Sequence, residues 1–198
     1  METISLKKFI YNCKSGDIIL FNGRKWYSKL IEWYCGSDIS HVGIVVIDPN
    51  INGKMTHGHF LLESKLYSNG KNGVRLTPLE EAFEENKDGK IYTRFLNCVR
   101  DSKFKLRIDN ICFNTLGKKY DDDPFDWFKV ISNIKIGNDH KTSRFWCSAL
   151  VAYSYILLGI LNPKIPWSMI KPSDFSSRST YSILKFNSYL TDDVQVLY

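Results

Sequence analysis

One uncharged run, Phe145 to Gly159, constrains the fold of this 198-residue chain more than any other segment. It consists of aliphatic, aromatic and small residues, which favours a helix that is buried on most of its sides. Gly159 stands where helices often end in the left-handed conformation, and Asn162-Pro163 prevents continuation. The run falls short of the ~20 apolar residues of a membrane span. The sequence therefore predicts a core helix on which the rest of the domain packs.

Cys147 lies in the first turn of this helix, just after the polar residues Thr142, Ser143 and Arg144. The partial positive charge and free N–H groups of a helix N-terminus favour a thiolate, and the same groups can bind an oxyanion. Cysteine is also a common core residue without any chemical role. The segment alone leaves two interpretations of Cys147, a nucleophile or a packing residue.

The cysteine pattern favours a reducing compartment. The number is odd, the positions are scattered, and there is no C-x-x-C pair, so a disulfide framework is not indicated. We expect Cys98 and Cys112 to be buried with protonated thiols, and Cys13 and Cys35 to be more exposed. Residues 1–13 show no secretory signal, which predicts a cytoplasmic protein, and the Lys-, Asn- and Ile-rich usage is typical of an AT-rich genome such as a viral one.

Composition limits the function classes. Hydrophobic content of 43% and charged content of 24% are ordinary for a soluble globular protein. The net charge of +6 comes from scattered lysines without an arginine-rich block. A dedicated nucleic-acid site is therefore not predicted, whereas weak contact with anionic membranes remains compatible with the charge. The oligomeric state is not predicted.

Strand and turn signals dominate the first half of the chain. Alternating or continuous apolar runs end at turn signals such as Asp48-Pro49-Asn50. We expect a short amphipathic helix over 26–34 and a tight turn at 69–73. Strands are predicted over 16–21, 39–47, 57–65, 74–76 and 91–96.

Helices dominate the second half. Thr77-Pro78-Leu79-Glu80 has the pattern of a capping box with proline at the first helical position, so a helix should run to about Glu85. Helical spacing predicts another helix over 101–117, followed by an irregular polar segment over 120–140. A proline-rich connector and one or two terminal strands should follow the Cys147 helix. The fold class is thus α+β, a mostly antiparallel sheet packed against helices.

The length suits a single domain spanning 1–198. Within it we expect a sheet part over about 14–98, a part with the cysteine helix over about 101–175, and a C-terminal extension over about 176–198. No internal repeat or low-complexity tract interrupts the chain.

A cysteine nucleophile needs a base within hydrogen-bond reach and a third group that orients the base. His41 lies on the apolar face of its strand, where an imidazole needs a partner, and Gly43 leaves room beside it. Glu63 ends an apolar run one strand later and could hold the imidazole in one tautomer. A structural histidine and a solvated carboxylate are the alternatives.

The other histidines carry weaker signals. His57 and His59 flank Gly58 in an H-x-H pattern, but no cysteine or carboxylate cluster accompanies them. We therefore predict neither a metal site nor a cofactor. His140 lies in a polar segment and should be solvated.

Four segments, taken in order, resemble a known family. They look like the circularly permuted branch of the NlpC-type papain-fold hydrolases, which includes bacterial YiiX-like proteins, a poxvirus group and, more distantly, lecithin–retinol acyltransferase relatives. In ordinary papain-like order the cysteine precedes the histidine, whereas in the permuted branch the histidine strand comes first, as here. The segments are Gly16-Asp17-Ile18-Ile19-Leu20-Phe21, Ser40-His41-Val42-Gly43-Ile44, Leu62-Glu63 and Phe145-Trp146-Cys147-Ser148-Ala149-Leu150-Val151.

The resemblance implies a permuted papain-like fold and a triad of Cys147 as nucleophile, His41 as base and Glu63 as orienting group. The segment 117–121 resembles a G-x-x-Y motif whose tyrosine, here Tyr120, borders the pocket. Trp146 and Ser148, which flank the nucleophile, are further candidates for the substrate pocket or oxyanion site. The segment 172–175 resembles one that packs near the site.

Three function classes follow from these residues. The first is a thiol hydrolase or acyltransferase that cleaves an amide or ester bond in a peptide, isopeptide or lipid acyl substrate through an acyl-enzyme. The second is a catalytically silent lipid- or peptide-binding module on the same fold. The third is a basic nucleic-acid or membrane-surface binder, which rests on the net charge alone. The presence of all three triad residues favours the first.

Overall fold

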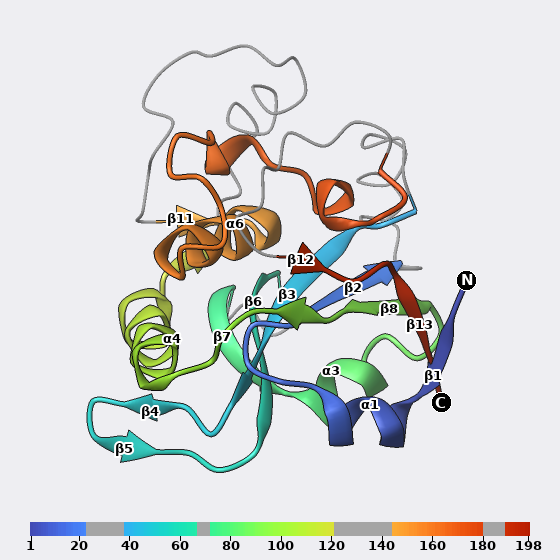
Figure 1. The fold of residues 1–198 in the computed structure, drawn as a ribbon, viewed down its shortest axis with the longest axis horizontal. Coiled ribbons are helices and arrows are strands. Elements are labelled where there is room, and N and C mark those ends of the chain that lie inside the picture. The colour runs from blue at the N-terminus through green and yellow to red at the C-terminus, as the bar shows by residue number, and fades with distance from the viewer. Residues whose placement is uncertain (23–37, 67–71, 121–143, 180–188) are drawn as a thin grey trace.

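A seven-stranded sheet forms the centre of the computed structural model, which describes residues 1–22, 38–66, 72–120, 144–179 and 189–198 (Figure 1). Every neighbouring pair in this sheet is antiparallel except β1 and β13. The α+β fold class is therefore confirmed. In sheet order, the strands are β1 (Thr3–Ser5), β13 (Val194–Leu197), β8 (Lys90–Arg94), β2 (Ile18–Asn22), β3 (His41–Ile47), β6 (His59–Lys65) and β7 (Gly73–Pro78).

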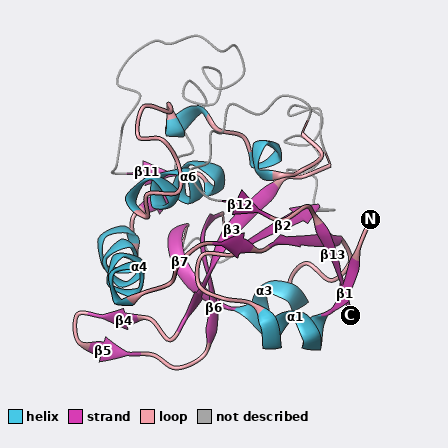
Figure 2. Cartoon of the chain, viewed as in Figure 1, coloured by secondary structure: helices cyan, strands magenta, loops and turns pink. Residues whose placement is uncertain are grey.

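Helices cover both faces of the sheet, as Figure 2 shows. Because side chains alternate along a strand, Ile18 and Leu20 face one hydrophobic cluster while Ile19 and Phe21 face the other. The first cluster includes residues of α4 and α6, and the second includes residues of α1 and α3. The helices are α1 (Leu6–Asn12), α3 (Leu79–Glu84), α4 (Ser102–Thr115) and α6 (Cys147–Leu157).

The two main helices of the second half agree with the sequence predictions. Helix α6 begins at Cys147, and Gly159 adopts the expected positive φ of 78° after its end. Helix α4 is capped by Asp101, whose side chain accepts a hydrogen bond from Phe104 N at 2.8 Å. Nowhere in the described ranges does a helix combine the length and apolarity that crossing a membrane requires.

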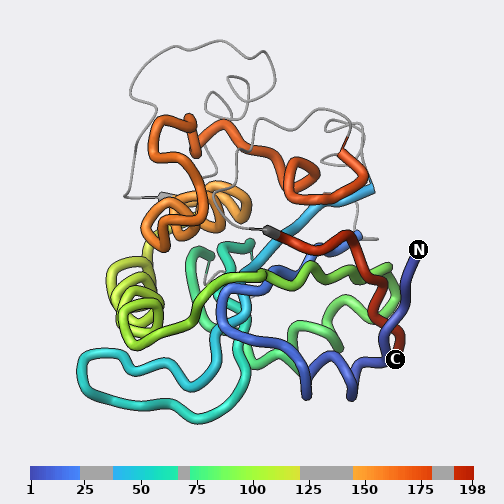
Figure 3. Tube along the Cα trace, viewed as in Figure 1, coloured from blue at the N-terminus to red at the C-terminus, as the bar shows by residue number. Residues whose placement is uncertain are grey.

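The two ends of the chain meet at one edge of the sheet, which the sequence did not predict. Strand β1 pairs with β13 in parallel, and β13 in turn pairs with β8 (Figure 3). The C-terminal segment, expected as an extension, thus contributes a strand between β1 and β8. Helix α1 follows β1 and buries Phe9 in the second cluster.

Short elements connect these layers. A hairpin of β4 (Asn50–Ile51) and β5 (Lys54–Met55) follows the predicted turn after β3. Strand β9 (Leu96–Asn97) pairs with β12 (Tyr189–Leu190), and two 3₁₀ turns, Trp167–Met169 and Pro172–Phe175, follow α6. The predictions over 26–34, 69–71 and 121–140 lie outside the described residues.

The start of α3 differs from the predicted capping box. Thr77 belongs to strand β7, Pro78 occupies the N-cap position, and no side chain caps the helix there. The hydroxyl of Thr77 bonds instead to Glu63 in the neighbouring strand. The helix itself was predicted correctly, because Leu79, Ala82 and Phe83 bury its apolar face.

The beginning of β7 holds the segment after α4 against the sheet. Val74 N donates to Lys118 O at 2.8 Å, and Gly117 N donates to Val74 O at 3.0 Å. This contact places β10 (Lys119–Tyr120) beside β11 (Arg144–Phe145), with Tyr120 paired to Phe145 in parallel. The backbone approach is so close that a Cβ built on Gly73 would lie 2.2 Å from Lys118 O.

We predict that Gly73→Ala lowers the free energy of unfolding more than Gly53→Ala. Both glycines have positive φ, 133° and 81°, so alanine is strained at each, but nothing lies within 4 Å of a Cβ at Gly53. Gly53→Ala should cost about 1–2 kcal/mol, whereas the added backbone clash at Gly73 should cost roughly 1–3 kcal/mol more. Urea unfolding of the two variants measures the difference, and equal losses would contradict the close approach.

Candidate active site

His41 is the first residue of β3 and lies opposite Phe21 of β2. Its ring packs against the Phe21 ring with centroids 5.6 Å apart, and its side chain is 16% exposed. The space that Gly43 leaves on this strand is filled by Leu61, whose side chain would lie 2.7 Å from a Cβ there. The imidazole is therefore packed on one side while its edges remain available for hydrogen bonds.

Glu63 holds this imidazole. The Oε2 atom of Glu63 lies 2.6 Å from Nε2 of His41, and Oε1 accepts a 2.6 Å hydrogen bond from the Thr77 hydroxyl. Glu63 is only 1% exposed, so the alternative interpretation of Glu63 as a solvated carboxylate at the end of a strand is wrong. Burial raises the pKa of Glu63, but the hydrogen bond and charge of His41, the charge of Lys65 and the Thr77 hydroxyl outweigh it and lower the pKa to about 2.

Helix α6 packs on β3 and brings Cys147 to His41. Cys147 is the first residue of α6, it is buried, and its side chain hydrogen-bonds to His41. Since Glu63 occupies Nε2, Nδ1 is the ring nitrogen left for a second partner. The structure thus brings together all three residues that the resemblance implied for the triad.

The charges in this arrangement favour imidazolium. Burial lowers the pKa of His41, but the hydrogen bond and negative charge of Cys147, and then those of Glu63, reverse the shift and raise it to about 9. A protonated His41 beside a thiol and a buried carboxylate is the arrangement in which an imidazole can activate a cysteine nucleophile and give a proton to a leaving group.

The N-terminus of α6 offers donors for an oxyanion. Trp146 is the N-cap and its side chain makes no capping bond, and the helical ladder starts with Leu150 N donating to Trp146 O at 3.1 Å. The N–H groups of residues 147–149 precede this ladder, beside the thiol. A carbonyl oxygen that becomes negative next to the sulfur can therefore be stabilised there.

The other candidate pocket residues are placed as follows. Tyr120 is buried in β10, paired with Phe145 and thus close in register to the nucleophile. Trp146 is largely buried. The Ser148 hydroxyl donates to Ile170 O at 2.6 Å, which ties α6 to the segment after it. A pocket or oxyanion role for these three side chains stays a prediction.

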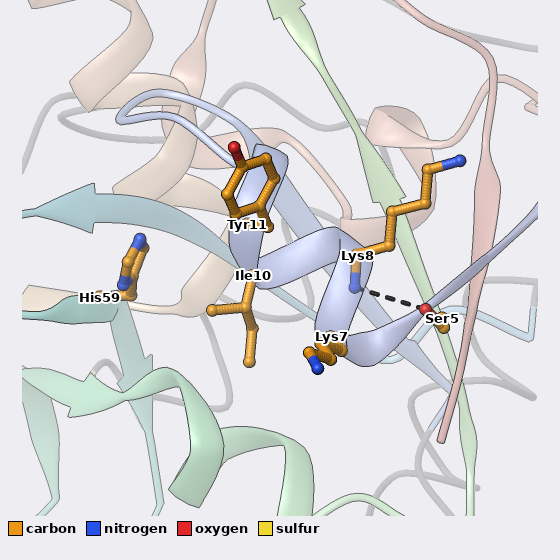
Figure 4. A pocket seen from close by; sticks show the side chains of 6 residues that line it. All are labelled: Ser5, Lys7, Lys8, Ile10, Tyr11 and His59. Atoms are coloured by element: carbon orange, nitrogen blue, oxygen red, sulfur yellow. Dashed lines mark hydrogen bonds between the residues drawn. The ribbon is translucent and has the colours of Figure 1, made fainter.

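His57 and His59 lie at a different place from the Cys147–His41 contact. The His57 side chain is exposed and lies 3.6 Å from Asp48, and His59 lines an open pocket of about 590 Å³ against α1 (Figure 4). Across the parts of the chain that the structure describes, no three His, Cys, Asp or Glu side chains gather as metal ligands would. His140 lies outside those parts.

The comparisons with known proteins agree with this geometry. The sequence pattern of the permuted papain-like amidases, YaeF/YiiX or family C92, matches residues 12–179. The chain belongs to this family. Membership confirms the permuted papain-like fold and supports cysteine hydrolase activity in general terms.

A solved structure with a similar fold is that of the metalloprotein yiiX from Escherichia coli O157:H7, which is 24% identical to this chain. The match covers 76% of this chain and 70% of yiiX, with a TM-score of 0.52. At this identity the likeness bears on the fold alone. No curated protein matches the chain.

The remaining cysteines of this family member differ from Cys147 in their surroundings. Cys13 was expected to be exposed, and this is wrong: α1 packs it against the sheet, where it is 4% exposed. Burial raises the pKa of Cys13 and of Cys112 to about 12. Cys98 was expected to be buried and is only partly so, and this partial burial also raises its pKa. Cys35 lies outside the described residues.

We predict that limiting iodoacetamide at pH about 6 alkylates Cys147 before the other cysteines. The thiolate is the reactive form, and Cys147 alone among the described cysteines contacts an imidazole whose pKa is raised. His41→Ala should slow this alkylation at least about tenfold, because it removes the cation beside the sulfur. Peptide mass spectrometry quantifies each site. Earlier alkylation of Cys13 or Cys98 would mean that Cys147 is an inert core thiol.

Proposed function

We propose that this protein hydrolyses an amide bond through a Cys147–His41–Glu63 triad and a thioester acyl-enzyme. The observation that carries the proposal is the continuous chain of contacts from the thiol to His41 and from His41 Nε2 to Glu63 Oε2 at 2.6 Å. The nucleophile contacts the base, and the base contacts the orienting group, which is the spatial order that this chemistry needs.

In the first step His41 holds the proton of Cys147, and the thiolate attacks the substrate carbonyl. The N–H groups at the start of α6 bind the oxyanion of the tetrahedral intermediate. The carbon–nitrogen bond then breaks, and His41 donates its proton to the departing amine. A water molecule attacks the thioester while His41 takes one of its protons, which releases a carboxylic acid and restores the thiol.

Glu63 does no bond-making in this scheme. Its buried carboxylate keeps Nε2 protonated and directs Nδ1 toward the sulfur. This intact arrangement weighs against the silent binding module, since a binding role does not need a buried charged pair beside a thiol. An amide substrate is favoured over an ester because the family is one of amidases. Transfer to an acceptor other than water follows the same first step.

The proposal is tested by trapping the acyl-enzyme. We expect acyl p-nitrophenyl esters and p-nitroanilides, offered with peptide and with fatty acyl groups, to release the chromophore and to add one acyl mass to the intact protein. The mass should map to Cys147, and Cys147→Ala should abolish it. An acyl group that maps elsewhere, or equal turnover by Cys147→Ala, would exclude the mechanism. The acyl series that reacts fastest distinguishes lipid from peptide substrates.

Variants of the other two residues should lose activity unequally. His41→Ala removes the base and should lower kcat by about 10²–10⁴-fold. Glu63→Gln keeps an oxygen for hydrogen bonding but removes the charge, so a smaller loss with measurable residual activity is expected. Steady-state kinetics on the best chromogenic substrate give both values, with unfolding curves as the control for stability. Wild-type kinetics for Glu63→Gln would remove Glu63 from the site.

A further inference from the structure

A fourth residue, Thr77, contacts the triad. Its hydroxyl donates a 2.6 Å hydrogen bond to Oε1 of Glu63, the oxygen that does not face His41. Thr77 and Glu63 are each 1% exposed, so water does not compete strongly for this bond. The contact lies within the sheet core, beside the candidate active site.

The sheet register explains how Thr77 reaches Glu63. In the β6–β7 pair, Leu61 lies opposite Thr77 and Glu63 lies opposite Arg75. Thr77 is therefore the diagonal neighbour of Glu63 on the same face, a distance that two side chains can bridge. A Thr hydroxyl that capped α3 would be unable to make this bond, and the structure shows that it does not cap α3.

An ionised carboxylate only accepts hydrogen bonds, and its two oxygens are interchangeable by rotation about the terminal torsion. With Thr77 at Oε1 and His41 at Oε2, one rotamer satisfies both donors at once. Without the Thr77 hydroxyl, the carboxylate loses a buried donor, and its terminal torsion loses one of the two contacts that hold an oxygen in line with His41.

We propose that Thr77 is a positioning residue of the active site, whose hydroxyl holds the carboxylate of Glu63 in the orientation that charges and directs His41. The proposal rests on the triad function proposed above. Thr77 touches neither substrate nor the reacting atoms, and it acts only through Glu63.

The two neighbouring cations have carboxylate partners of their own. Lys65 acts on Glu63 through its charge, but its ammonium is bound to Glu85 at 2.6 Å. Arg75, opposite Glu63, extends its guanidinium toward Glu81 and Glu85 at 3.7 and 3.9 Å. Thr77 gives Glu63 a directed hydrogen bond from a neutral donor, and a directed bond fixes a rotamer better than diffuse charge does.

The test compares Thr77→Val, which keeps the shape but removes the hydroxyl, with Thr77→Ser, which keeps the hydroxyl. Thr93→Val is the matched control: Thr93 is a fully buried threonine of β8 whose hydroxyl donates to the backbone oxygen of Ile18 at 3.0 Å. Two readouts need no substrate, namely the pKa of His41 by ¹⁵N NMR and the pH profile of Cys147 alkylation by iodoacetamide.

We expect Thr77→Val to lower the pKa of His41 by about one unit and to slow Cys147 alkylation several-fold at neutral pH, because a loosened Glu63 stabilises the imidazolium less. Thr77→Ser should remain close to wild type in both readouts. Thr93→Val should lower stability while leaving both readouts unchanged. In a Glu63→Gln background, Thr77→Val should have no further effect on alkylation.

An unchanged His41 pKa and alkylation profile in folded Thr77→Val would overturn the proposal, as would an equal change in Thr93→Val. If Thr77→Val does not fold, Thr77→Ala removes the hydroxyl without pressing a methyl group on the carboxylate and is judged in the same way. A wild-type protein in which Cys147 is not alkylated first and His41 titrates normally would defeat the proposed function itself. If the wild-type protein behaves as the proposed function requires but Thr77→Val changes neither readout, only the inference about Thr77 is wrong.

Discussion

The candidate active site depends on one ion pair, His41 with Glu63, held within the core of the sheet. Removing a carboxylate and an imidazolium from water costs several kcal/mol per ion unless geometry and further hydrogen bonds compensate. The antiparallel register of β3, β6 and β7 supplies both, because it sets the 2.6 Å contact between the pair and the second donor at Glu63. Helix α6 then only has to present a thiol to the free edge of the ring.

The features that were predictable from sequence have local signals. The apolar run with Cys147 at its start and Gly159 after its end defined α6, and alternating apolar residues defined the central strands. His41 and Glu63 had only ambiguous signals as single residues. They became a candidate site through the order of four motifs, and the match over residues 12–179 confirms the family in which that order is found.

The features that were missed depend on distant parts of the chain. The sequence Thr-Pro-Leu-Glu is the same whether the Thr77 hydroxyl caps α3 or bonds to Glu63, and only the packing of β6 on β7 decides. Cys13 is buried because α1 lies on the sheet, and α1 is preceded by β1, whose strand partner is β13 at the far end of the chain. No local sequence pattern predicts a pairing between strands so far apart in the chain.

The parallel pairing of β1 with β13 has a consequence for the order of the chain. Because β1 and β13 run in the same direction at this edge, a linker from Tyr198 to Met1 has to return along the strand pair, and one of about a dozen residues is long enough to do so without disturbing a strand. New ends opened between Lys87 and Asp88, in the exposed turn between α3 and β8, would then make Cys147 the first of the triad, followed by His41 and Glu63. That is the cysteine-before-histidine order of ordinary papain-like enzymes. The order of the triad residues along the chain can thus change while their arrangement in space stays the same, and the change depends on joining the two termini.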